Sequence, residues 1–130
     1  MNPQLTHYED KLNYEMDSAD LFDALGRGDP VVIIDARRTD AYAHEHIPGA
    51  VNFPHGTMNA ASTAGLDRTK TYIAYCDGIG CNASTRGARN LAALGFTVRE
   101  LIGGLDWWKR DGYATEGTGA QTGTGIRCAC

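Results

Sequence analysis

Short apolar runs alternate with amphipathic stretches along this chain, and this alternation locates strands before any motif is considered. The run Val31–Ile34 is continuously β-branched, as in a strand whose two faces are both buried. Thr71–Tyr75 is a second apolar run, Val98–Leu101 is a third, and a shorter one at Val51–Phe53 is stopped by Pro54. These four runs are predicted to be strands.

Helical patterns lie between the strands. Asp17 or Ser18 can cap a helix that ends near Gly28 and carries Leu21, Phe22 and Leu25 on one face. Further helices are predicted over residues 84–94 and 103–112. Thr39 is expected to cap a short helical turn. Residues 55–69 are expected to be irregular, with one helical turn. Strands alternating with helices indicate an α/β domain with a mainly parallel sheet.

Composition divides the chain into three parts. Residues 17–115 carry the alternating pattern and are predicted to form the single domain. Residues 1–16 have little apolar pattern and are expected to wrap the domain surface. Residues 116–130 are rich in Gly, Thr, Ala and Gln and are expected to be a disordered tail, because they offer too little apolar surface to offset ordering entropy.

Charge and hydropathy exclude several classes of function. The formal net charge is −4, from 12 Lys+Arg against 16 Asp+Glu, which argues against nucleic acid as a partner. No run approaches the roughly 18 apolar residues of a membrane span, and the first ten residues do not resemble a secretory signal. A cytoplasmic, reducing location is therefore expected.

The four cysteines fall into two close pairs, Cys76/Cys81 and Cys128/Cys130. A reducing location disfavours structural disulfides, and Cys-x-Cys is tighter than the usual zinc-ligand spacing. The segment His44–His46 has two imidazoles but no third ligand cluster near it in the sequence. We therefore expect neither a metal nor an organic cofactor.

The strongest chemical signal is Cys76, which ends the predicted strand 71–75 and opens a glycine-bearing loop before the helix at 84–94. Backbone N–H groups converge at such a junction, and the helix N-terminus adds partial positive charge. Both effects favour thiolate over thiol and lower the cysteine pKa. The sequence thus points to thiolate chemistry.

Three segments together resemble the rhodanese-like sulfurtransferase family: Val32–Arg37 with Tyr42 and His46–Pro54, then Tyr75–Cys76 with the following loop and helix, then Leu94–Phe96 with Leu101–Gly104, Trp108 and Gly112–Tyr113. The resemblance implies a single α/β domain with helices on both faces of a central parallel sheet. It also implies that Cys76 accepts sulfane sulfur as a persulfide from a small donor such as thiosulfate. A thiol, cyanide or a sulfur-accepting protein would then receive the sulfur.

The chain departs from the family loop, which reads Cys-x-x-Gly-x-Arg and then Ser. Here Ser84 lies eight residues after Cys76, so the loop is about two residues longer, and Ala83 stands where the family has arginine. Arg86 and Arg37 remain as candidate anion contacts. The predicted substrate-binding loop comprises Asp77, Gly78, Ile79, Gly80, Cys81, Asn82, Ala83 and Ser84.

Cys81 offers a second alignment, since Cys81–Arg86 reproduces the family's cysteine-to-arginine spacing. We prefer Cys76 as the nucleophile because it lies at the strand-to-loop junction. Cys81 then becomes a resolving thiol that attacks the persulfide or forms a reversible disulfide, or a small buried filler. The tail cysteines, Cys128 and Cys130, are either an internal sulfur acceptor or incidental.

Other candidates have structural interpretations. Asp35 is expected to fix the strand-end loop together with Arg37. His46 is expected to hydrogen-bond the backbone. Of the two tryptophans, Trp108 is assigned to the core and Trp107 is expected to form a wall of the pocket. Two rival functions remain. The longer loop suits arsenate-reductase or phosphatase chemistry, although the missing arginine opposes it, and Cys76 with Cys81 suits a non-catalytic redox sensor.

Overall fold

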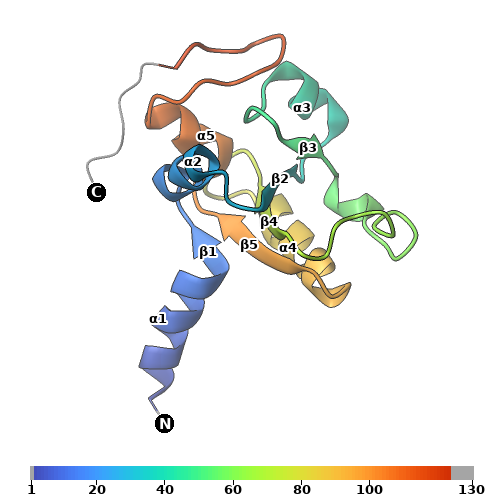
Figure 1. Cartoon of the computed structure of the whole chain (residues 1–130). Helices are drawn as coiled ribbons and strands as arrows, with labels where there is room; N and C mark the ends of the chain where they lie inside the picture. Colours follow the sequence, from blue (N-terminus) through green and yellow to red (C-terminus); the bar gives the residue numbers. More distant parts are fainter. Residues whose placement is uncertain (1, 124–130) are drawn as a thin grey trace.

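The computed structural model describes residues 2–123 and contains one five-stranded sheet, with every neighbouring pair parallel (Figure 1). The strand order is β1-β5-β4-β2-β3. The strands are β1 (Glu15–Met16), β2 (Val31–Asp35), β3 (Val51–Asn52), β4 (Thr71–Tyr75) and β5 (Thr97–Leu101). The predicted strands are confirmed, and β1 is an addition that the sequence pattern did not reveal.

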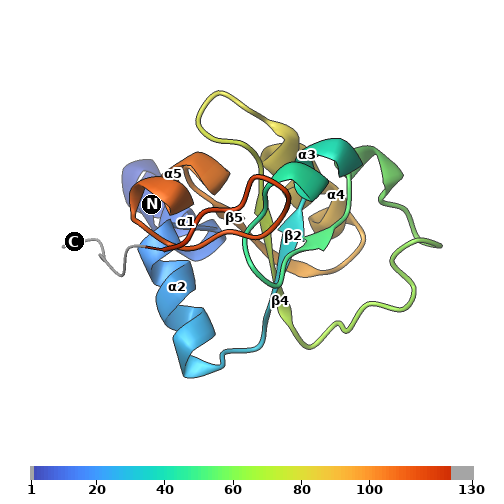
Figure 2. The ribbon, with the colours of Figure 1, turned by 90° about the horizontal axis from the view of Figure 1, so that it is seen from above.

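Helices cover both faces of the sheet, as the views in Figures 1 and 2 agree. One face packs against Leu21 of α2 and Leu105 and Trp108 of α5. The other packs against Leu91 of α4 and Met58, which follows the 3₁₀ turn η1. The helices are α1 (Pro3–Tyr14), α2 (Ser18–Arg27), α3 (Thr39–His44), η1 (His55–Thr57), α4 (Ala83–Ala93) and α5 (Gly104–Arg110). The predicted fold class is therefore confirmed.

Local signals explain the helix ends. Asp17 caps α2 in a capping box with Asp20, and Gly28 closes it at φ 72°, a left-handed conformation that suits glycine. In α3 the cap position is Arg38 rather than the predicted Thr39, which is the first helical residue. The hydroxyl of Thr39 therefore does not make the cap.

The expectation that residues 1–16 wrap the domain is wrong for α1. Asn2 caps this helix through hydrogen bonds to the N–H groups of Gln4 and Leu5, and Pro3 begins it. All of its side chains are exposed, and Figure 1 shows it leading away from the sheet. Its few apolar residues do not reach the core, so capping and helix propensity determine its form.

The tail differs from its predicted disorder over its first residues. Glu116 forms an antiparallel bridge with His46, and the N–H groups of Thr118 and Gly119 donate to the carbonyls of Ala43 and His44. This segment therefore packs along the end of α3. Cys128 and Cys130 lie outside the described residues.

No helix among residues 2–123 combines the length and the apolar character needed to cross a bilayer.

Candidate active site

The site lies at the carboxyl end of β4, the central strand of the sheet. Residues that end β2 and β5 flank it, because parallel strands bring their carboxyl ends to one edge. Cys76 directly follows β4 and is 2% exposed. A chain connection of seven residues, 76–82, then leads to α4.

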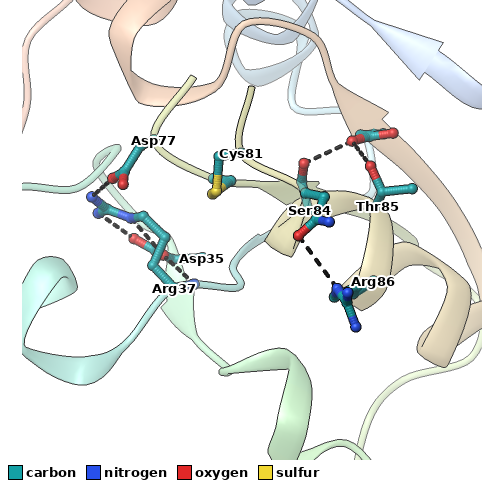
Figure 3. The surroundings of a disulfide bond; sticks show 10 residues. Asp35, Arg37, Asp77, Cys81, Ser84, Thr85 and Arg86 are labelled. Carbon is teal, nitrogen blue, oxygen red and sulfur yellow. Dashed lines mark hydrogen bonds and ion pairs between the residues drawn. A yellow bond between two sulfur atoms is a disulfide. The ribbon is translucent and has the colours of Figure 1, made fainter. Parts of the chain in front are cut away.

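Cys76 is joined to Cys81 by a disulfide bond (Figure 3). The Cα atoms of the two residues are 6.3 Å apart, and the N–H of Cys81 donates to the carbonyl of Gly78 in a turn that brings the chain back. Gly80 has φ 93°, a conformation that L side chains rarely adopt. The bond agrees with the predicted alternative in which Cys81 forms a disulfide with Cys76, although disulfides in general were not expected, and the glycine turn explains how the loop closes locally.

The first residues of the loop are held by the N-terminus of α5. The carbonyl of Cys76 accepts from the N–H of Leu105 at 2.9 Å, and that of Asp77 accepts from Asp106 at 2.8 Å. This close approach requires glycine at position 104, since a Cβ there would lie 2.2 Å from the Cys76 carbonyl oxygen. The backbone of Cys76 is thus fixed from both β4 and α5.

Most N–H groups of the loop have no partner. Within the described part of the chain, only Cys81 among residues 77–82 donates its N–H to another group. The remaining donors belong to Asp77, Gly78, Ile79, Gly80 and Asn82. Unpaired main-chain donors beside a sulfur atom are suited to stabilise an anion that forms there.

A buried ion-pair network underlies the first half of the loop. The carboxylate of Asp35 accepts from Nε and Nη2 of Arg37 at 3.0 and 2.7 Å, and from the hydroxyl of Tyr75 at 2.6 Å. Nη1 of Arg37 then reaches Asp77 at 2.8 Å, and Nη2 also donates to the carbonyl of Glu45. Figure 3 shows this group on one side of the disulfide. Arg37 therefore ties the end of β2 to the loop.

Burial and charge determine the protonation of this network. Burial on its own lowers the pKa of Arg37, but the hydrogen bonds that it donates to the Asp35 and Asp77 carboxylates raise the pKa above the ordinary value. Burial also raises the pKa of Tyr75, and the charge of Asp35 raises it further. Arg37 is consequently a permanent cation and Tyr75 a permanent hydroxyl donor.

A cavity of about 490 Å³ opens beside the disulfide. Cys76, Asp77, Cys81 and Ala83 form its loop side, and it is otherwise lined by Ala36, Arg37, Arg38, Ala41, Pro54, His55 and Gly56. A smaller hollow of about 180 Å³ lies on the opposite side of the same loop, with Gly78, Ile79, Gly80 and Ser84 in its wall. The two sulfurs thus lie between two recesses, of which the larger carries the cations.

Two predicted site residues face elsewhere. Arg86 donates its Nε to Oδ1 of Asn82 at 3.3 Å, does not line the cavity, and lies on the opposite side of the disulfide from Arg37 in Figure 3. Ser84 donates its hydroxyl to Glu100 at 2.7 Å, as does Thr85. The structure thus brings Arg37 to the cavity, and neither Arg86 nor the Ser84 hydroxyl.

The remaining candidates are placed away from the sulfurs. Nδ1 of His46 lies 2.7 Å from the carbonyl of Tyr42, so this imidazole bonds the main chain. Trp108 is buried and donates its Nε1 to Ala114. Trp107 is 44% exposed and lines neither recess beside the loop, so it does not wall the pocket.

Sequence reasoning missed Tyr75 and His55. Tyr75 of β4 lies directly beside Asp35 of the neighbouring strand β2. Knowing the register of these two strands would have predicted that contact. His55 joins the cavity wall because Pro54 ends β3 at the same sheet edge. No local motif marks it.

Three groups able to ligate a metal lie together within the described chain. The sulfurs of Cys76 and Cys81 and a carboxylate oxygen of Asp77 are within 4.8 Å of one another. Both sulfurs are bonded to each other, and thiolate rather than disulfide sulfur is the metal ligand. In this oxidation state the cluster offers only the Asp77 carboxylate, which Arg37 already pairs.

Comparison with known proteins gives several relatives. The HTH-type transcriptional regulator Rv0324 of Mycobacterium tuberculosis is 32% identical over 95 residues, which are 73% of this chain and 41% of the regulator. The chain thus spans less than half the length of that relative. The thiosulfate sulfurtransferase GlpE of Coxiella burnetii is 36% identical over 81 residues, covering 61% of this chain and 72% of GlpE.

A solved structure and a family model match the same region of the chain as these relatives. The crystal structure of the BH2092 protein of Bacillus halodurans superposes with a TM-score of 0.86 at 39% identity, covering 92% of this chain and 89% of that one. The model of the rhodanese-like domain matches residues 18–111. That match includes both cysteines of the loop and the Asp35–Arg37 pair, so this chain belongs to the rhodanese-like domain family.

Proposed function

We propose that the protein is a sulfurtransferase whose carrier is Cys76. The observation that carries the proposal is the position of this cysteine, fixed at the carboxyl end of β4 beside a cavity and within a loop of unpaired N–H donors. A thiolate there attacks the outer sulfur of a donor such as thiosulfate. The sulfur–sulfur bond of the donor breaks, sulfite leaves with the electron pair, and Cys76 retains one extra sulfur as a persulfide.

Two guanidinium groups reach the cavity. Arg37 and Arg38 both line it, and Arg37 is held in place by Asp35. Arg38 is exposed and pairs with Asp40, so its positive charge is partly offset at the rim. Both guanidinium groups are thus paired with carboxylates, and the unpaired N–H groups of the loop remain as the anion contacts for thiosulfate.

The second step regenerates the thiolate. A thiol or cyanide attacks the outer sulfur of the persulfide, the Cys–S–S bond breaks, and Cys76 recovers its electron pair. The relative from Coxiella burnetii, whose name is thiosulfate sulfurtransferase, supports this reaction at 36% identity. Sulfur transfer therefore agrees with both the site and the family.

Phosphatase and arsenate-reductase chemistry receives less support. Such reactions depend on a guanidinium that clamps the oxyanion at the end of the loop. Here Ala83 occupies that place and lines the cavity, while Arg86 bonds Asn82 outside it. Arg37 cannot substitute freely, because its guanidinium already serves Asp35, Asp77 and the Glu45 carbonyl.

The test is intact mass after the reduced chain has met thiosulfate, with Cys128→Ser and Cys130→Ser present in every variant so that the tail contributes no thiol. The Cys81→Ser variant, which cannot close the loop disulfide, is expected to gain one sulfur atom. The matched Cys76→Ser variant is expected to gain none and to form no thiocyanate from thiosulfate and cyanide. Sulfur uptake by Cys76→Ser, or none by Cys81→Ser, would overturn the assignment of the carrier.

A further inference from the structure

We propose that Cys81 is the internal thiol that discharges the Cys76 persulfide, releasing hydrosulfide and leaving the disulfide seen in the structure. The inference rests on the proposed function, since it takes the persulfide as its starting point. It identifies hydrosulfide as the product released when the persulfide is discharged, and a dithiol as the class of reductant that must then reopen the disulfide. The family resemblance supplies only one of the two cysteines, and the second is a feature of this loop.

The geometry places the second thiol within reach of the first. The disulfide itself shows that the loop brings Cys81 Sγ into bonding contact with Cys76 Sγ. Only five positions separate the two residues in sequence. An attack by Cys81 is therefore intramolecular and far more frequent than one by a dilute external thiol.

The two ends of the loop differ in freedom, as this role requires. Cys76 is buried and its carbonyl is held by Leu105, so the carrier remains in place when it gains a sulfur. Toward Cys81, the side chain of Ile79 is 83% exposed and a Cβ added to Gly80 would meet nothing within 4 Å. A persulfide needs room for one more sulfur–sulfur bond of about 2 Å, and the Cys81 end can move to provide it.

Cys81 lies at the N-terminal end of α4, where several charges meet. The residue precedes Asn82, the cap position of the 11-residue helix α4, and no acidic residue lies in the first turn. The side chain of Asn82 does not cap the helix, because its Oδ1 accepts from Arg86 instead. The positive end of the helix dipole favours negative charge on Cys81, and the Glu100 carboxylate, which accepts from Ser84 and Thr85 in the first turn, opposes it. The nearby carboxylate of Asp77 opposes this less strongly, since Arg37 pairs with it.

The step balances without any further reactant. Cys81 thiolate attacks the Cys76 sulfur of the protonated persulfide (Cys76–S–SH), a Cys76–Cys81 bond forms, and the bond from Cys76 to the outer sulfur breaks, so that this sulfur keeps its proton. The outer sulfur leaves with the electron pair as hydrosulfide, so it is reduced by two electrons while the two cysteines are oxidised. Attack on the inner sulfur is the step that yields the Cys76–Cys81 disulfide of the structure, with hydrosulfide as the leaving group.

The disulfide must then be reduced before Cys76 can accept sulfur again. A dithiol reductant, of the class that reduces protein disulfides, supplies the two electrons and becomes a disulfide itself. In the oxidised state of the structure neither cysteine is a thiolate. The protein as described is accordingly at the end of one half-cycle.

The experiment uses the full chain, reduced, freed of reductant, kept from oxygen, and given one equivalent of thiosulfate with no thiol present. We expect one equivalent of hydrosulfide per chain, and a peptide map in which the Cys76 and Cys81 peptides are linked. The Cys81→Ser variant should instead keep its extra sulfur, with a persulfide lifetime longer by about a hundredfold or more. Addition of a dithiol should then release hydrosulfide from that variant.

Two controls separate the outcomes. A chain with Cys128→Ser and Cys130→Ser should release hydrosulfide as the full chain does, and loss of release there would overturn the role of Cys81. A full chain that keeps its persulfide and releases nothing would also overturn it, while leaving sulfur transfer by Cys76 intact. Failure of Cys81→Ser to take up sulfur would instead remove the proposed function. The peptide map of the unsubstituted chain decides the matter even if a variant fails to fold.

Discussion

Within the loop that joins β4 to α4, the residues nearest Cys76 are tied to neighbouring elements, whereas those nearest Cys81 touch little. Leu105 and Asp106 donate to the carbonyls of Cys76 and Asp77, and Arg37 binds the Asp77 side chain. Among residues 79–82 of the described structure, Cys81 donates to the carbonyl of Gly78 and Asn82 accepts from Arg86, and neither bond reaches another strand or helix than α4. One half is anchored and the other is free.

This difference corresponds to the two tasks that the cysteines would perform. A carrier benefits from a fixed position, because donor and acceptor must approach it in line. A resolving thiol must approach, bond and withdraw, and a loosely held loop end allows this at low energetic cost. The comparison between the anchored and the free half can be tested by matched pairs of substitutions in the loop and in the elements that hold it.

The largest effect is expected from Asp35→Asn in the anchored half. Asp35 is fully buried and pairs with a guanidinium whose side chain is only 7% exposed. Loss of its charge leaves Arg37 without its buried partner, and breaking such a pair costs about 3–5 kcal/mol. Urea denaturation of the reduced protein would measure the loss in the free energy of unfolding.

Asp77→Asn is the matched control, since Asp77 binds the same guanidinium but its side chain is 71% exposed. Solvent screens this pair, so the loss should remain below about 1 kcal/mol. Equal losses from both substitutions would show that the anchoring does not come from the buried end of the network.

A second pair compares Gly104→Ala with Gly80→Ala. Both glycines have positive φ, 56° and 93°, so each substitution strains the backbone by about 1–2 kcal/mol. Only at position 104 does the new Cβ also collide with the main chain, at the Cys76 carbonyl, which adds about 1–3 kcal/mol. Gly104→Ala should therefore lose more stability and should also slow persulfide formation by the reduced chain, measured by mass against time. A slower rate for Gly80→Ala alone would reverse the assignment of the two halves.

Local sequence signals were sufficient for most of the fold. The β-branched run of β2 and the capping residues of α2 act over a few positions, so periodicity and caps predict them directly. The helix α1 was missed because it buries no apolar face, which is the feature that periodicity detects. Residues 116–119 were misassigned because their partners are main-chain groups of residues 43–46, and composition does not report such pairing.

The site was predictable only where it is local. The strand-to-loop junction places Cys76, and the glycines of the loop explain why Cys81 returns to it. The contact between Arg37 and Asp77 spans 40 positions and depends on which strands are neighbours, so no motif contains it. For the same reason the sequence did not show that the Ser84 hydroxyl is held by Glu100. Which arginine faces the sulfurs is thus a property of the sheet order.

The smallest effect on the free energy of unfolding is expected from Ile→Val substitutions at positions 73 and 79. Comparing the two shows directly whether the loop side chains pack against the domain. Ile73 is fully buried in β4, three residues before Cys76, whereas Ile79 is 83% exposed in the free half. Ile73→Val removes one buried methylene and should cost about 0.5–1.5 kcal/mol. Ile79→Val should alter the free energy of unfolding by less than about 0.5 kcal/mol, because a solvated side chain loses no packing. Denaturation of both reduced variants provides the comparison, and a loss at Ile79 as large as at Ile73 would mean that the loop packs once its disulfide is opened. In that case the Cys81 end would be held as firmly as the Cys76 end, and a resolving thiol could not move there at low cost.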